Sequence, residues 1–274
     1  VAIFLGEKPE NHEGKVYLAH TLEETARMAV DLANGDPVKD NYCDPIDYEV
    51  SRPLAADKTV KGLYSGGSLA AEAGMLIAEA LNLGGLIKEE GYILKTGGYE
   101  VVDLGDDVYT QGKPHPMIDP EVRIKKILEC AKDPQTGVIL LDCMLGYGCH
   151  PDMAGALAPA IREAQEIAKA DGRELYFVAS VCGTRQDPQD YDRAVAELKE
   201  CGVLVEESNA RAIRLALKLK GIDYKENTRG HVEAAVDETP LPEPDEKIME
   251  LLNTKPRVIN VGVRSFNDSI VAYN

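Results

Sequence analysis

The sequence contains no tryptophan and only 3 phenylalanines among its 274 residues. The core must therefore be built mainly from Ala, Val, Leu and Ile, which suits helices packed on a parallel sheet. Basic residues are also scarce, because 30 Lys and Arg stand against 47 Asp and Glu, for a formal net charge of −17. Nucleic acids and anionic membrane surfaces are bound by clustered Lys and Arg, so this balance argues against both partners.

Long apolar runs and paired cysteines are missing as well. No run approaches the about 20 apolar residues of a membrane-spanning helix, and no signal peptide is recognisable. No two cysteines form a CxxC pair, so no metal site is expected. Several thiols lie in or beside apolar runs, which predicts buried, reduced cysteines in a soluble, cytoplasmic protein. The six are Cys43, Cys130, Cys143, Cys149, Cys182 and Cys201.

What the sequence does contain is an alternation of strand-like and helix-like runs, which is typical of βαβ units in an α/β fold. Strands are expected at residues 1–6, 60–65, 99–107, 136–148, 174–184, 203–208 and 257–262. Helices are expected at residues 21–35, 66–83, 119–133, 151–172, 187–202 and 209–221. Thr21 and Glu24 form a capping-box pattern, and Asp187 with Pro188 is expected to begin another helix.

A weak internal repeat suggests how the chain is divided. The run VAIFLG and the later VYLAHTLEETARMAVDLANG parallel YFVASVCG and VLVEESNARAIRLALKLKG. Because Val1 opens a strand with no preceding turn, we expect residues 1–50 to be the C-terminal part of a first α/β domain and a linker. Residues 51–225 are expected to form a related parallel-sheet domain, and residues 226–274 a charged linker with a C-terminal strand segment.

Ligands of open parallel sheets bind beyond the carboxyl ends of the strands, where four glycine-rich or polar loops are expected here. The first loop holds the candidate anion-binding residues Ser65, Gly66, Gly67 and Ser68. Its glycines allow close approach to the backbone, and the following helix N-terminus favours phosphate or carboxylate. It has no GKS or GKT and is not a Walker loop. A tight turn with a serine N-cap remains the structural alternative.

The second loop, residues 104–120, is long and rich in reactive side chains, and such loops are often functional. His115 lies between two prolines and could act as a general acid or base or as an anion ligand. The alternative is a surface loop with a hydrogen-bonded histidine. The candidate substrate-loop residues are Asp106, Asp107, Thr110, Lys113 and Asp119.

The third loop carries Gly146, Gly148 and His150, which could face the same crevice as His115. A neutral imidazole could serve there as a phosphate-accepting nucleophile, although a capping or packing role for His150 fits equally well. The fourth loop offers Gly183 and Thr184 as anion-binding candidates, with Arg185 beside them; a purely structural cap is the alternative. The remaining histidines, expected in solvent or linkers, are His12, His20 and His231.

The ordered runs GLYSGGSLAAEA, DLGDDVYTQGKPHPMIDP, LLDCMLGYGCHPD, CGTRQDPQ and VINVG closely resemble the FdrA family of the succinyl-CoA synthetase superfamily. The resemblance implies a flavodoxin-like ligase-CoA domain, preceded in the family by a CoA-binding domain that lies outside this sequence. Synthetase α chains carry a phosphorylated histidine in a GHAGA-like loop after the strand matched here to YFVASVCGT. The corresponding RQDPQDYDRAV has no histidine, so that relay is expected to be lost unless His150 or His115 replaces it.

The resemblance further implies a subunit of a phosphate-handling carbamoyltransferase of allantoin breakdown, which converts oxalurate and phosphate to oxamate and carbamoyl phosphate. His115 and His150 are then the catalytic candidates. The expected partners are a small anionic substrate and further subunits, identical or different, while any CoA or nucleotide would bind through another domain or chain. The alternatives are a nucleotide-dependent acyl-CoA synthetase and a non-catalytic scaffold subunit.

Overall fold

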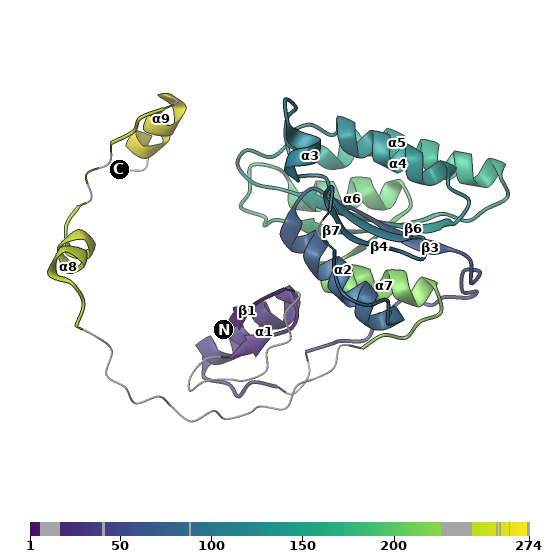
Figure 1. Cartoon of the computed structure of the whole chain (residues 1–274), viewed down its shortest axis with the longest axis horizontal. Helices are drawn as coiled ribbons and strands as arrows, with labels where there is room; N and C mark the ends of the chain where they lie inside the picture. The colour runs from purple at the N-terminus through teal and green to yellow at the C-terminus, as the bar shows by residue number, and fades with distance from the viewer. Residues whose placement is uncertain are drawn as a thin grey trace. The chain divides into compact units, whose positions relative to one another are not determined.

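The computed structural model describes residues 1–5, 17–39, 42–87, 89–225, 243–255, 257, 259–262 and 264–272. These residues belong to two compact units, Val1–Ala235 and Val236–Asn274, which are described separately. The first unit contains the sheet and the helices that cover it (Figure 1).

A sheet of six strands organises the first unit, in the order β4-β5-β3-β6-β7-β8. The strands are β3 (Thr59–Tyr64), β4 (Tyr92–Thr96), β5 (Tyr99–Asp103), β6 (Thr136–Met144), β7 (Tyr176–Cys182) and β8 (Val203–Glu206). All neighbours pair in parallel except β4, which is antiparallel to β5. Without β4 the order is that of flavodoxin-like folds, so the predicted flavodoxin-like α/β class is confirmed.

Helices cover both faces of this sheet (Figure 1). They are α2 (Gly67–Leu81), α3 (Asp107–Thr110), α4 (Glu121–Lys132), α5 (Met153–Ala170), α6 (Tyr191–Glu200) and α7 (Asn209–Leu219). One core lies between the sheet and α4, α5 and α6, and a second lies between the sheet and α2 and α7. The helix predicted to start at 187 begins at Tyr191, because Asp190 rather than Asp187 accepts the capping hydrogen bond, from Arg193 N.

The central strand β6 explains why the core needs so few aromatic residues. Its side chains alternate between the two cores, with Ile139 and Leu141 in one and Val138 and Leu140 in the other. All four are at most 2% exposed. Branched aliphatic side chains on both faces fit against alanine-rich helices, and each such side chain contributes about 1.5–3 kcal/mol on burial.

The antiparallel hairpin of β4 and β5 was not predicted. Its turn is Gly97–Gly98, and both glycines have positive φ values, of 56° and 85°. Two-residue hairpin turns of this kind need left-handed backbone at both positions. The pair of glycines between YILKT and YEVVD was therefore the available sequence signal.

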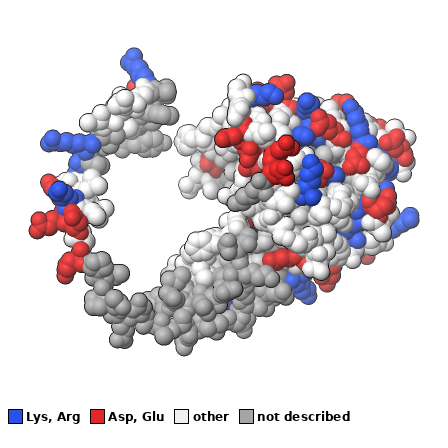
Figure 2. All heavy atoms as spheres, in the orientation of Figure 1, with Lys and Arg blue, Asp and Glu red and all other residues white. Residues whose placement is uncertain are grey.

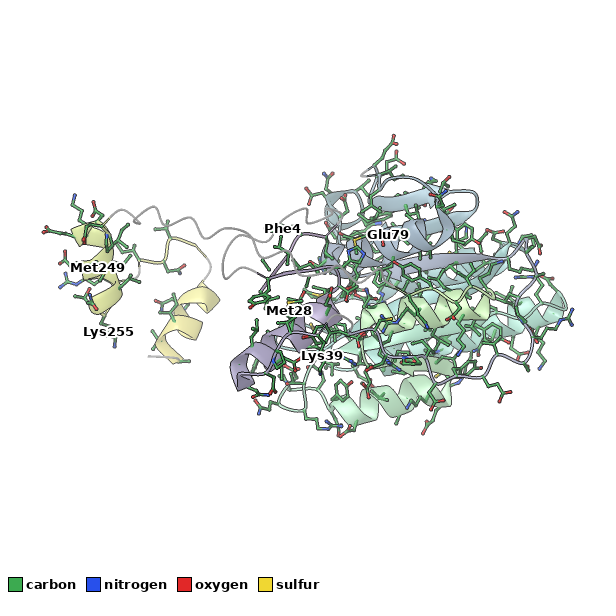
Figure 3. The ribbon with its side chains drawn as sticks, turned by 90° about the horizontal axis from the view of Figure 1, so that it is seen from below. Phe4, Met28, Lys39, Glu79, Met249 and Lys255 are labelled. Atoms are coloured by element: carbon green, nitrogen blue, oxygen red, sulfur yellow. The ribbon has the colours of Figure 1, made fainter. Side chains whose placement is uncertain are left out.

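A small parallel pair, β1 (Ala2–Ile3) with β2 (Leu18–Ala19), precedes α1 (Leu22–Asn34). Thr21 caps α1 as predicted, since its hydroxyl accepts from Glu24 N at 3.1 Å. The Glu24 carboxylate reaches one residue further back than a capping box requires and accepts from His20 N at 2.6 Å. Met28 of α1, labelled in Figure 3, packs in a separate small core.

This N-terminal segment docks on α2 and α7 through polar contacts. Glu23 at the start of α1 pairs with Arg214 of α7 at 2.9 Å, and the two side chains are 7% and 4% exposed. Leu22 N donates to the fully buried Glu72 of α2 at 2.7 Å. His20, expected in solvent, is 8% exposed and hydrogen-bonded to Glu79 at 2.9 Å, so that expectation was wrong. His12 and His231 lie outside the described residues.

The second unit contains α8 (Glu246–Asn253) and α9 (Arg264–Ala272); Met249 of α8 is labelled in Figure 3. A strand was predicted at 257–262, but its described residues, 257 and 259–262, belong to no strand. A strand gains its backbone hydrogen bonds from a neighbouring strand, and the described part of this unit offers none. The apolar alternation in RVINVG was thus insufficient evidence for a strand.

All six cysteines are free thiols, as predicted, but their burial differs. Cys143 and Cys201 are buried, whereas Cys182 is exposed, contrary to the expectation for its apolar run. It is the last residue of β7, where the chain leaves the sheet. Burial raises the pKa of the Cys143 thiol to about 12 and that of Cys130 to about 11.

Replacing Arg214 by Met should destabilise the protein, because Glu23 would lose a partner inside a low-dielectric contact. Removal of one partner from a buried pair costs roughly 3–5 kcal/mol, and we expect about 3 because Arg27 also pairs with Glu23. The shift is measured as a lowered midpoint in urea unfolding. Arg185→Met, in an exposed pair with Asp192, is the matched control and should leave the midpoint nearly unchanged. Equal midpoints for the two variants would contradict the buried-pair interpretation.

Thiol labelling should follow exposure and pKa. A thiol reagent is expected to modify Cys182 first, and its rate should increase as the pH rises from about 7 to about 10, because only the thiolate reacts and partial burial raises the pKa of this thiol. Cys143 should stay unmodified until the protein unfolds. Mass spectrometry identifies the labelled site, and Cys182→Ser should remove the fast phase. Early labelling of Cys143 would show that the core opens readily.

Candidate functional site

Three loops follow strands that flank a change in strand order. From β3 the chain first adds β5 on one side and then β6 on the other, so the switch point lies between β3 and β6. The loops after β3, β5 and β6 all leave the carboxyl edge at this point, where ligands of such sheets bind. The predicted grouping of these loops at one edge is therefore confirmed.

A buried ion pair joins the strands at the switch point. Asp142 of β6 accepts from Arg123 Nη2 of α4 at 2.8 Å, and neither residue is exposed. The same carboxylate accepts from Ser65 N at 3.0 Å and from Ser65 Oγ at 2.6 Å. Ser65 was predicted as an anion ligand, but both of its donors are used by Asp142 and the residue is 0% exposed. It anchors the loop after β3 instead.

The N-terminus of α2 is open. Gly66 is the N-cap with extended backbone and provides no side-chain hydrogen bond, so the first turn has N–H groups without a hydrogen-bond partner among the described residues. Gly67 and Ser68 are exposed there. Three of the predicted anion-binding residues, Gly66 to Ser68, are thus placed at a helix terminus that favours negative charge.

Asp103, the last residue of β5, lies against this helix terminus. A Cβ atom on Gly67 would come within 2.9 Å of Asp103 Oδ2, so a larger residue there would require this carboxylate to shift. Oδ1 of the same carboxylate accepts from Gly105 N at 2.9 Å. Desolvation raises the pKa of Asp103, and the nearby Asp106 carboxylate adds to the increase while His115 opposes it. Asp103 was not among the predicted site residues, although an acidic residue at a strand end shortly before a candidate histidine was a usable signal.

His115 converges on the same place. A Cβ on Gly105 would lie 2.6 Å from His115 Nε2, 2.8 Å from the carbonyl oxygen of Ser65 and 3.1 Å from Asp103 Oδ1. Nδ1 of His115 accepts from Met117 N at 3.2 Å, so the neutral imidazole carries its proton on Nε2. The histidine therefore presents an N–H donor toward Asp103 and the loop after β3.

The other candidates of the 104–120 loop have different surroundings. Asp106 caps the short helix α3 by accepting from Val108 N at 3.0 Å, and Thr110 Oγ1 donates to the backbone of Asp106. Asp119 accepts from Glu121 N at 2.8 Å at the start of α4. Lys113 and Asp119 line a cavity of about 350 Å³ against α4 that does not include His115. Asp107 is exposed on α3. The side chains of Asp106, Thr110 and Asp119 are thus engaged in local turns, while Asp119 N donates to the His115 carbonyl oxygen at 3.0 Å.

His150 is linked to the His115 loop by Met117. His150 N donates to the Met117 carbonyl oxygen at 2.7 Å, while Nδ1 of His150 accepts from Asp152 N at 3.0 Å. Its neutral form again carries the proton on Nε2. The two histidine-bearing loops are therefore in backbone contact, and a shared crevice for the two imidazoles stays a prediction.

The glycines of the His150 loop are less available than those before α2. Gly146 and Gly148 adopt positive φ values of 127° and 84°, which explains why glycine stands there. Gly146 N already donates to Gln189 Oε1 at 2.9 Å. The next helix, α5, is closed by its own N-cap, because Asp152 accepts from Gly155 N at 3.0 Å. This loop offers fewer free backbone donors than the start of α2.

The fourth loop follows β7 and contacts the His150 loop through Gln189, whose amide nitrogen donates to the carbonyl oxygens of Gly146 and His150 at 3.0 and 3.3 Å. Thr184 N donates to Asp187 Oδ2 at 2.5 Å, and Thr184 Oγ1 accepts from Gln186 N at 3.1 Å. Gly183 and Thr184 line a cavity of about 780 Å³ with residues of α6 and β8, and neither His115 nor His150 lines it. Arg185 is paired with Asp192 at 2.9 Å. The loop therefore does not complete the arrangement around His115.

Metal binding and membrane insertion also bear on the class of site. Across the residues that the structure describes, no group of three or more His, Cys, Asp or Glu is placed to hold a metal ion. No helix in that part of the chain is long and apolar enough to cross a membrane. On the face shown in Figure 2, described basic and acidic side chains are interspersed over the domain.

Comparisons with known proteins bear on the family. A curated relative, the uncharacterized protein YahF of Escherichia coli, is 34% identical over 226 residues. The match covers 77% of this chain but 43% of the relative, so the chain spans less than half of that protein's length.

Two solved structures are also similar. One is a mutant ATP citrate lyase of Methanosaeta concilii in complex with (3S)-citryl-CoA, and the other is ATP citrate lyase from Methanothrix soehngenii in complex with citrate and coenzyme A. They are 17% and 16% identical, each with a TM-score of 0.37, and the match covers 77% of this chain and 31% of each of theirs.

The model of the CoA-ligase family matches residues 63–219, which is more than half of the sequence. The match runs from the end of β3 to the last residue of α7, and so it includes all of β4, β5, β6, β7 and β8. The chain belongs to the CoA-ligase family.

Proposed function

We propose that this CoA-ligase family member is an FdrA-like subunit of a phosphate-handling carbamoyltransferase that converts oxalurate and phosphate to oxamate and carbamoyl phosphate. One observation carries the proposal: the open N-terminus of α2, the Asp103 carboxylate and the Nε2 of His115 converge at the switch point. Helix N–H groups suit an oxyanion, and the neutral imidazole supplies a donor for charge that develops on a carbonyl oxygen.

The reaction balances with these groups. A phosphate oxygen bonds to the carbamoyl carbon of oxalurate, and the bond from that carbon to the oxamate nitrogen breaks. The proton lost by hydrogen phosphate ends on the departing nitrogen. The N–H group on His115 Nε2 stabilises the tetrahedral oxyanion, or gives its own proton to the departing nitrogen and takes the phosphate proton in its place, and no phosphorylated histidine is needed.

Nucleotide-dependent acyl-CoA synthesis is the second candidate, and membership of the CoA-ligase family favours it. That chemistry would need CoA and nucleotide sites supplied by another domain or chain. The domain division proposed from the sequence is compatible with both functions, with residues 1–50 as part of a related α/β domain before residues 51–225. Either function would be carried out with partner subunits, identical or different.

Ser68→Asp should weaken anion binding without unfolding the protein. Ser68 is exposed in the first turn of α2, where an acidic side chain interacts favourably with the helix dipole but repels phosphate. Titration calorimetry with inorganic phosphate should show a loss of affinity of roughly tenfold or more. Ser68→Ala is the matched control and should bind with little change. Undiminished binding by Ser68→Asp would place the anion elsewhere.

His115→Gln should slow the assembled complex by roughly 10²-fold, because glutamine keeps a polar group but cannot transfer a proton. The measurement is carbamoyl phosphate formation from oxalurate and phosphate, with kcat and KM determined separately. Loss confined to kcat is expected. An unchanged rate would remove His115 from the mechanism. An acid-labile label on His115 or His150 after incubation with γ-labelled nucleotide would favour the acyl-CoA synthetase instead.

A further inference from the structure

The Asp103 carboxylate has one oxygen fixed and one free. Oδ1 accepts from Gly105 N at 2.9 Å, which holds the side chain in place. Within the described residues, Oδ2 makes no hydrogen bond and lies beside Gly67, where a Cβ would come within 2.9 Å. The residue is half-buried at the end of β5. A fixed acceptor thus borders the place where the helix donors and His115 Nε2 converge.

An ionised carboxylate only accepts hydrogen bonds, so it discriminates among oxyanions. Sulfate has no proton near neutral pH and would bring its charge and a lone pair against Oδ2. Hydrogen phosphate has an O–H group that can donate to this oxygen, and an O–H···O⁻ bond is among the stronger hydrogen bonds of proteins. Leaving a partly desolvated acceptor unpaired beside a second anion is unfavourable.

We propose that Asp103 is a specificity-determining residue, which makes this crevice accept oxyanions that carry a proton, such as hydrogen phosphate, and reject those that do not, such as sulfate. The inference rests on the proposed anion site and adds the chemical class that the site selects. It also assigns the phosphate proton to a defined acceptor before the carbamoyl transfer begins.

A purely structural role for Asp103 is the competing explanation, since the bond to Gly105 N alone could fix the turn after β5. The two roles use different oxygens. Asp103→Asn keeps an amide oxygen for Gly105 N and replaces the free acceptor by an N–H donor, so it separates them.

The experiment is titration calorimetry of the full chain with inorganic phosphate and with sulfate, at equal ionic strength and near neutral pH. The unmodified protein should bind phosphate at least about tenfold more tightly than sulfate. Asp103→Asn should lose most of this preference, chiefly by binding sulfate more tightly. Asp57→Asn is the matched control, because it removes the same charge at an exposed position before the amino end of β3 and should keep the preference.

The outcomes distinguish a failure of the anion selectivity from a failure of the anion site itself. If the unmodified protein binds both anions equally, the selectivity inference is overturned while the anion site stands. Binding of neither anion would overturn both. A preference that persists in a folded Asp103→Asn variant would assign Asp103 the structural role. If that variant does not fold, the ratio of phosphate to sulfate affinity of the unmodified protein still tests whether the crevice selects between the two anions.

Discussion

The Arg123–Asp142 pair is the constraint on which the switch point depends. It lies wholly inside the protein, and the same carboxylate holds the backbone and hydroxyl of Ser65. A charge this deep is costly unless every partner is in place, so the pair ties α4, β6 and the end of β3 to one relative arrangement. The contacts with Asp142 are made by Arg123 Nη2, while Nε and Nη1 have no hydrogen-bond partner within the described chain. The loops that carry the candidate site start from this fixed point.

The second requirement of the candidate site is that polar side chains approach the backbone closely, and two glycines allow this. Gly67 leaves room for the carboxylate of Asp103, and Gly105 leaves room for His115 Nε2 and the Ser65 carbonyl oxygen. A methyl group at either position would occupy the space in which these polar atoms converge. Close approach explains Gly67 and Gly105 better than backbone freedom does, because neither of these two glycines has a positive φ. The missing side chains at Gly67 and Gly105 therefore contribute to the site as much as the polar side chains do.

The periodic features of the sequence predicted the fold well, whereas contacts between distant residues escaped it. Alternating apolar runs located the parallel strands, and strand ends placed His115 and His150 at one edge. The role of Asp142 depends on an arginine 19 residues away in sequence and on Ser65 from another strand. The capping residue Asp190 was missed because Asp187 offered the same pattern three residues earlier. Such choices are decided by packing in three dimensions, which local propensity does not contain.

The hydrogen bonds of the edge loops also limit what the crevice can bind. Backbone N–H groups at the starts of helices already donate to the carboxylates of Asp106, Asp119 and Asp152. The backbone N–H groups of Thr184 and Gly146 donate to Asp187 and Gln189, respectively. Among the described residues, the donors near His115 include its own Nε2 and the first N–H groups of α2, and the acceptors include Asp103 Oδ2 and the Ser65 carbonyl oxygen. This small set of donors and acceptors suits a small oxyanion that both accepts and donates hydrogen bonds. The net charge of −17 strengthens this requirement, because a fully ionised ligand would enter against the field of the whole protein.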